Sequence, residues 1–136
     1  MHALLGIDLG TTGVKAALFA AEDGHVLSSS FVEYPLLHPQ PGWAEQHPAD
    51  WWQATVAAIR TCLAQAALRD VQPADVQGIG LSGQMHGVVL LDEENQVLRP
   101  CNRGGADNAC GVVHDSIDNQ EGELLCIHTI ALRRRT

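Results

Sequence analysis

The sequence has 136 residues, a length typical of one small domain. Hydrophobic residues make up 46% of the chain and charged residues 18%, which excludes an intrinsically disordered protein. The formal net charge of −8 repels nucleic acid and anionic membrane surfaces, and no apolar run approaches the roughly 20 residues that cross a bilayer. We therefore expect neither a nucleic-acid nor a membrane partner.

The first part of the chain predicts a β-meander of three strands, at residues 3–9, 14–21 and 26–34. The first of these is a nearly continuous apolar run, broken only by Gly6 and Asp8, which is typical of a central strand buried on both faces. Turn signals separate the strands, and the Asp23-Gly24 pair is a hairpin signal. This order of elements differs from a βαβ unit.

A helix is expected after a proline-rich connection. Residues 35–48 hold four of the six prolines, which excludes regular structure there, whereas Pro48 suits the first position of a helix. The spacing of the following apolar residues predicts one buried helix face, made by Trp52, Val56, Ile59, Leu63 and Ala66. Two more strands are expected at residues 76–81 and 88–91.

The beginning of the sequence predicts a cytoplasmic protein. It lacks a basic start, and Asp8 interrupts its apolar stretch, so we expect no signal peptide. The four cysteines should then be reduced: Cys62, Cys101, Cys110 and Cys126. No C-x-x-C pair is present and the spacings fit no common zinc module, which argues against a structural zinc site.

The strongest signal for a site is the segment from Asp8 to Lys15. An acid at the end of a buried strand needs a partner, and a metal ion or its bound water is a suitable one. Glycines on both sides of two threonines let backbone N–H groups approach an anion, and the hydroxyls add donors: Gly10, Thr11, Thr12 and Gly13. Lys15 is the only lysine in the chain. We predict a phosphate-binding hairpin without Walker A spacing, the alternative being an ordinary tight hairpin with a surface lysine.

A second cluster follows the strand expected at residues 76–81. Gln84 and His86 can hydrogen-bond to hydroxyl groups, and Met85 offers an adaptable apolar contact. Ligands bind at the carboxyl ends of strands in α/β sheets, although a loop histidine and a core methionine are the alternative interpretation. Residues 78–83 also match G-x-G-x-x-G, but a turn and a strand follow them where a dinucleotide site requires a helix.

These segments resemble the FGGY family of carbohydrate kinases, within the actin and hexokinase superfamily of ATPases. Residues 8–15 are similar to the family's first phosphate loop, and residues 41–46 with Trp51 and Trp52 to its linker into the first helix. Residues 79–87 resemble the sugar-contacting turn of xylulokinases, and the likeness runs over residues 3–100. It implies an α/β fold of the ribonuclease H-like type, with a mixed sheet, present here as a partial domain.

The resemblance implies ATP-dependent phosphorylation of a pentulose, D-xylulose to D-xylulose 5-phosphate, with ATP and Mg²⁺ as cofactors. Asp8 would hold the metal ion through a bound water. The residues that would face the phosphates are Gly10, Thr11, Thr12 and Lys15. Gln84, Met85 and His86 would line the sugar site. The partners would be the sugar and ATP, and the family likeness also allows a homodimer.

The amino-acid composition changes after Pro100, so we expect a boundary between residues 1–100 and 101–136. Residues 104–111 resemble a later family segment, in which Asp107 would be the catalytic base and Asn108 would help hold the sugar. The alternative is a turn in a disordered tail. Residues 122–129 resemble a degraded second phosphate loop, in which His128 replaces a glycine.

The two likenesses together suggest a kinase that is truncated or internally deleted. Two competing hypotheses belong to other classes of function. The first is a non-catalytic kinase fragment with at most weak sugar binding, and the second is an actin-like interaction module that binds ATP without any effect of sugar.

Overall fold

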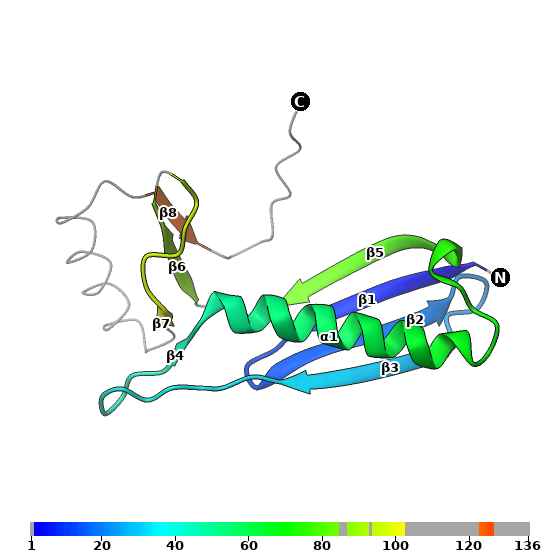
Figure 1. Ribbon diagram of the computed structural model, residues 1–136, viewed down its shortest axis with the longest axis horizontal. Coiled ribbons are helices and arrows are strands. Elements are labelled where there is room, and N and C mark those ends of the chain that lie inside the picture. The colour runs from blue at the N-terminus through cyan, green and yellow to red at the C-terminus, as the bar shows by residue number, and fades with distance from the viewer. Residues whose placement is uncertain (1, 85–86, 93, 103–122, 127–136) are drawn as a thin grey trace. The chain divides into compact units, whose positions relative to one another are not determined.

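The computed structural model describes residues 2–84, 87–92, 94–102 and 123–126 (Figure 1). Its main elements are strands β1 (Ala3–Leu9), β2 (Gly13–Ala20), β3 (Val26–Glu33), β4 (Glu45–Gln46), helix α1 (Pro48–Ala67), a 3₁₀ turn (Pro73–Asp75), and strands β5 (Val76–Gly83), β6 (Val88–Leu91), β7 (Cys101–Asn102) and β8 (Glu123–Cys126). The chain divides into two compact units, which we call unit 1 (Met1–Tyr34 with Trp51–Gln84) and unit 2 (Pro35–Asp50 with Met85–Thr136). Among the described residues, no helix combines the length and apolar character needed to span a membrane.

Unit 1 is built on a mixed sheet with the strand order β3-β2-β1-β5. The first three strands form the expected antiparallel meander, and β5 returns parallel to β1. The β2–β3 hairpin turns at Gly24, whose φ of 76° favours glycine because a side chain is strained there. The five strands expected from the sequence are thus confirmed to within about two residues at each end.

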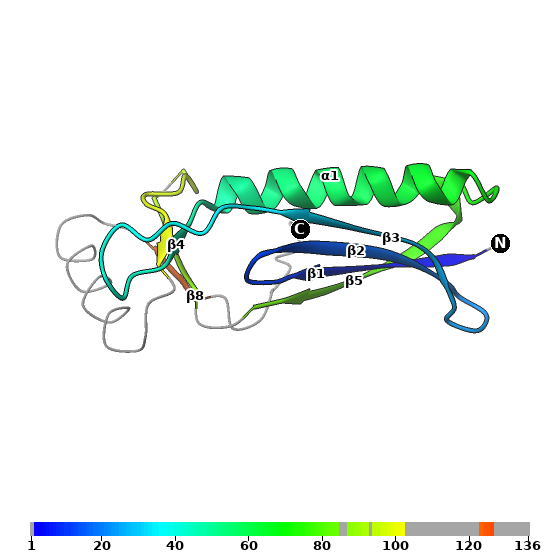
Figure 2. The same cartoon turned by 90° about the horizontal axis from the view of Figure 1, so that it is seen from below.

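Helix α1 covers one face of this sheet (Figure 2). It begins at Pro48 as expected, but its buried face is made of Trp51, Ala54, Ala58, Cys62 and Ala66. The predicted face was wrong at Trp52, whose surface is 71% exposed. Small side chains at nearly four-residue intervals let the helix lie close to the sheet. The close packing stabilises the chain more than burying the larger apolar residues of the predicted face would. The Ser28 hydroxyl of β3 donates a hydrogen bond to the Cys62 carbonyl of α1 at 2.9 Å.

The second face of the unit 1 sheet has no described α-helix of that unit packed on it (Figure 2). Burial alternates along β1, with Ala3, Leu5 and Ile7 buried and Leu4 44% exposed. The expectation that this strand is buried on both faces is therefore wrong for the described structure. The reason is that only one layer, α1, packs on the sheet among the described elements of unit 1.

Unit 2 contains a second, smaller sheet with the order β4-β7-β6-β8. The expectation of no regular structure in residues 35–48 is wrong at Glu45 and Gln46, whose backbone pairs with β7 because no proline interrupts it there. The buried Glu45 carboxylate accepts a hydrogen bond from the Arg99 guanidinium at 3.0 Å. The same guanidinium lies 6.0 Å from the centre of the Trp43 ring, a cation–π distance.

Candidate functional site

Three polar side chains from adjacent strands of unit 1 lie at the end of the sheet where β1 finishes. Asp8 stands directly opposite Lys15 of β2 and opposite Ser82 of β5. Side chains opposite one another on adjacent strands share one face of a sheet and lie close together. All three line a cavity of about 560 Å³ on the sheet face away from α1. The structure thus brings together the carboxylate and the only lysine that the sequence singled out.

The Asp8 carboxylate is exposed, so its expected burial is wrong. Its neighbours Ile7 and Leu9 point to the other side of the pleat, since successive side chains of a strand alternate between faces. Burial therefore cannot be the reason why Asp8 would bind a metal ion. An exposed carboxylate needs no buried counter-charge, but it is accessible to a hydrated cation that arrives from solvent.

The turn between β1 and β2 is closed by its own backbone and held by Tyr34. The Gly10 N–H donates to the Gly13 carbonyl at 2.9 Å, and the buried Tyr34 hydroxyl donates to the carbonyls of Gly10 and, at 3.2 Å, Gly13. The Tyr34 N–H in turn donates to the Thr12 carbonyl at 3.2 Å. The Gly10 N–H is therefore already committed within the turn, whereas Thr11 and Thr12 are exposed at its tip.

The sequence did not point to Tyr34 as part of the site. It is the only tyrosine of the chain and comes just after an expected strand, but its contact with the turn crosses more than twenty residues of sequence. Neither hydrophobic periodicity nor a local motif reports such a contact.

Gly13 is required by the close approach of β3 to the turn. A Cβ atom there would lie 2.5 Å from the Val32 carbonyl oxygen and 2.6 Å from the Phe31 ring. At Gly10 the nearest atom to an added Cβ would be the Gly13 carbonyl oxygen, at 3.1 Å. Both glycines of the motif thus serve the tightness of the turn itself.

The second candidate cluster begins where β5 ends, beside the same turn. The Gln84 N–H donates to the Leu9 carbonyl at 2.9 Å, which holds this backbone next to the last residue of β1. The G-x-G-x-x-G match of residues 78–83 lies inside β5, so it does not form the turn of a dinucleotide site. Met85 and His86, Asp107 and Asn108, and His128 lie outside the described residues.

No group of three or more histidine, cysteine or acidic side chains is placed to hold a metal ion in the part of the chain that the structure describes. Of the described residues that line the cavity, Asp8 supplies the carboxylate oxygen, the ligand type that Mg²⁺ prefers. Because Mg²⁺ keeps several waters and is commonly shared with substrate phosphates, one carboxylate fits an ion that enters with a nucleotide.

The mixed sheet with its antiparallel meander, parallel β5 and covering helix places the chain in the ribonuclease H-like class of α/β folds. The chain matches the N-terminal domain of the FGGY family of carbohydrate kinases over residues 3–127. It belongs to that family.

Named relatives agree with this assignment. The chain is 42% identical over 116 residues to the xylulose kinase of Klebsiella pneumoniae, and 43% identical over 99 residues to that of Bacillus subtilis. These alignments cover 83% and 73% of this chain but 23% and 19% of the relatives. The crystal structure of xylulose kinase from Rhodospirillum rubrum matches with a TM-score of 0.70 at 31% identity, over 84% of this chain and 23% of that one. The chain thus spans about a fifth of the length of these kinases.

Proposed function

We propose that this chain carries the phosphate-binding and sugar-contacting part of an ATP-dependent pentulose kinase, which converts D-xylulose to D-xylulose 5-phosphate. The observation that supports this best is the pairing of Asp8 with Lys15 beside a turn held by Tyr34. The two residues belong to a sheet whose fold and sequence are similar to those of proteins named xylulose kinases. The partners are then a small sugar and ATP.

Each side chain of the turn has a role in this proposal. The Lys15 ammonium and the hydroxyls of Thr11 and Thr12 donate to phosphate oxygens, and charge neutralisation there favours transfer of the phosphoryl group. Asp8 holds Mg²⁺ through bound water. When bound, Mg-ATP supplies the phosphoryl group that is transferred.

The sugar side of the proposal depends on Gln84, directly after the end of β5, and on residues outside the described structure. Gln84, Met85, His86 and Asn108 hold the sugar, and the Asp107 carboxylate takes the proton from the attacking hydroxyl. Catalysis depends on holding that hydroxyl in line with the γ-phosphate.

The test is ADP production by the purified chain after addition of D-xylulose. Replacing Lys15 or Asp107 with alanine should lower the rate by about 100-fold, because each removes a group that acts in the transition state. Arg60→Ala removes a cation from the exposed side of α1 and should change the rate by less than about twofold. A wild-type rate no higher than that of Lys15→Ala rules out the kinase proposal.

A specific observation favours a second candidate function. The chain spans about a fifth of its relatives, so a non-catalytic fragment that binds sugar weakly is the alternative. Calorimetric titration with D-xylulose separates the two, since heat of binding without ADP production supports the fragment. We also propose that residues 1–100 and 104–129 derive from non-adjacent parts of one kinase, with the intervening stretch removed. An uninterrupted reading frame in the coding DNA, together with an intact mass of a stable, abundant protein, would argue against a lost segment.

A further inference from the structure

A second cavity of unit 1 lies between β3 and the end of α1. Its volume is about 450 Å³, which is within the range of small-molecule sites. Residues 26–29 of β3 line one side of it, and the helix end contributes Gln65, Leu68 and Arg69. Val26 and Ser29 also border the cavity of about 560 Å³, because β3 is the edge strand of the sheet. Gln65, Leu68 and Arg69 line the smaller cavity and not the larger one.

The Arg69 side chain is held in place at the wall of this smaller cavity. Its Nη1 atom donates to the Leu27 carbonyl at 2.9 Å, and its backbone N–H donates to the Ala66 carbonyl at 2.9 Å. A guanidinium has five N–H groups, so the bond to Leu27 leaves others able to bind a ligand. In the part of the chain that the structure describes, no acidic side chain forms an ion pair with Arg69. The cavity therefore contains a positioned cation that can take an anionic partner.

The polar groups of the lining favour a singly charged anion. Gln65 and Ser29 add an amide and a hydroxyl that can both donate hydrogen bonds, and none of the described lining residues is acidic. A guanidinium binds a carboxylate or a phosphate through two parallel N–H bonds. Arg69 is the one cation among the described lining residues, so it balances one negative charge. A carboxylate carries one charge, whereas a phosphate monoester carries up to about two at neutral pH.

Apolar side chains complete the lining and indicate what the carboxylate is attached to. Leu68 is 88% exposed and Val26 is 53% exposed, so a ligand with an apolar carbon chain would remove part of their surface from water. We propose that the smaller cavity binds a small organic carboxylate with a short apolar chain, through the guanidinium of Arg69. This site goes beyond the proposed kinase activity, because neither Gln65 nor Arg69 has a role in that proposal.

The experiment titrates the full 136-residue chain with sodium hexanoate at neutral pH in a calorimeter, without sugar or nucleotide. We expect saturable binding with a Kd below about 1 mM. Hexanamide has the same shape without the charge and should bind at least about tenfold more weakly. Gln65→Glu places a negative charge in the lining and should weaken hexanoate binding by at least about tenfold. Gln53→Glu adds the same charge at an exposed position of α1 outside the cavity and should change the Kd by less than about twofold.

Arg69→Gln removes the cation and should also weaken hexanoate binding by at least about tenfold, with circular dichroism to show that the variant is folded. If it is not folded, Gln65→Glu decides, because that change leaves the Arg69 side chain in place. Absence of binding by the wild-type chain, or equal binding by Gln65→Glu and Gln53→Glu, overturns the proposal. Loss of binding in Lys15→Gln also overturns it by assigning hexanoate to the larger cavity, and tighter binding of hexyl phosphate overturns the choice of a carboxylate. Each of these outcomes is independent of the ADP assay.

Discussion

Tyr34 shows how one buried hydroxyl can hold a tight turn in place. It reaches two carbonyl groups of the turn, those of Gly10 and Gly13, and its ring is almost fully buried. The backbone of the turn is thereby ordered by the fold itself, which would lower the entropic cost of the phosphate binding proposed for it.

Tyr34→Phe should lower the free energy of unfolding by about 1–2 kcal/mol, because the Gly10 carbonyl loses the tyrosine donor and the Gly13 carbonyl keeps only the Gly10 N–H of the two donors described for it. Urea unfolding of the purified chain measures the change. Ser29→Ala removes a hydroxyl from an exposed position and should stay within about 0.5 kcal/mol of the wild type. An equal effect of both substitutions would contradict the proposed role of Tyr34.

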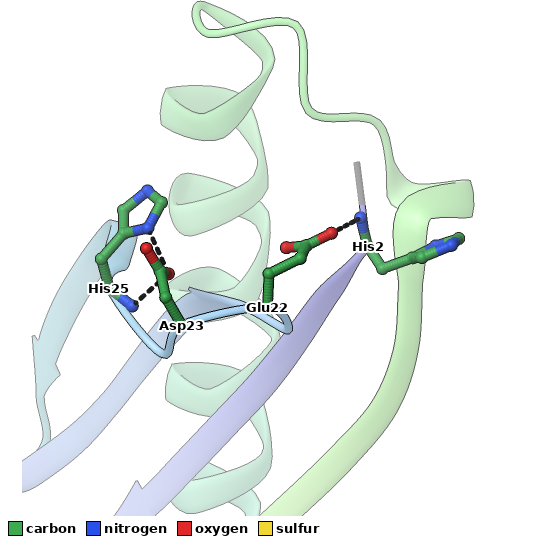
Figure 3. Close-up of polar contacts among 4 residues, drawn as sticks. All are labelled: His2, Glu22, Asp23 and His25. Atoms are coloured by element: carbon green, nitrogen blue, oxygen red, sulfur yellow. Dashed lines mark hydrogen bonds and ion pairs between the residues drawn. The ribbon is translucent and has the colours of Figure 1, made fainter.

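The hairpin between β2 and β3 carries a second local contact, at the opposite end of β2 from the Gly10–Gly13 turn (Figure 3). The Asp23 carboxylate accepts a hydrogen bond from the His25 N–H at 3.1 Å and lies 2.6 Å from the His25 ring nitrogen Nδ1. The hydrogen bond from the His25 backbone, followed by that from its side chain, lowers the pKa of Asp23 from the usual 3.8. Glu22 makes a separate, longer contact by accepting from the His2 N–H at 3.5 Å.

This contact makes a small part of the stability depend on pH. A carboxyl group with a lowered pKa in the folded state stabilises the fold above the unfolded pKa of 3.8, and the contribution is lost as the pH falls through the folded pKa. Melting temperatures of the wild type and Asp23→Asn should therefore differ at about pH 6, and the difference should shrink as the pH falls below 3.8. A difference that stays constant, or grows as the pH falls, would contradict this assignment.

At the scale of the element, α1 was located correctly, but of its predicted buried face only Ala66 is among the fully buried residues of the helix. Its start at Pro48 follows from local chemistry, because proline fits the first turn of a helix. Its orientation is decided by contact with the sheet, where alanine and cysteine allow closer packing than leucine and isoleucine. Hydrophobicity alone ranks Trp52 and Val56 above Ala54 and Ala58. A prediction based on it therefore chooses an adjacent face of the helix as the buried one.

Ala58→Leu should destabilise the chain by about 1–3 kcal/mol, since the residue is completely buried and the larger side chain pushes the helix away from the sheet. Ala57→Leu is the matched control on the exposed side of the same turn, and it should change stability by less than about 0.5 kcal/mol. Chemical denaturation of the two variants compares them directly. A larger effect at Ala57 would show that the helix buries a different face.

At the scale of the whole molecule, the acidic balance limits the range of partners. A net charge of −8 opposes contact with phosphate backbones, and the one lysine is placed in the candidate phosphate site. We expect no saturable binding of duplex DNA at protein concentrations up to about 10 μM, as measured by fluorescence anisotropy. Salt-sensitive binding in that range would contradict the expectation.

The sequence by itself determined the family, the strands of the meander, the start of the helix and the position of the turn between β1 and β2. These features are local: tight turns require glycine, proline starts a helix, and alternating or continuous apolar residues mark strands. Asp8 and Lys15, which the sequence placed in one hairpin, do lie opposite one another because the first hairpin brings neighbours in sequence together in space.

Only the tertiary structure decided which face of α1 is buried, that Asp8 is exposed, and that Tyr34 holds the turn. Each of these depends on contacts between residues far apart in the chain, and such contacts leave no periodic pattern in the sequence. The same holds for the uncovered face of the sheet. The apolar pattern of β1 predicts two covering layers, but packing in three dimensions shows that the described chain provides one.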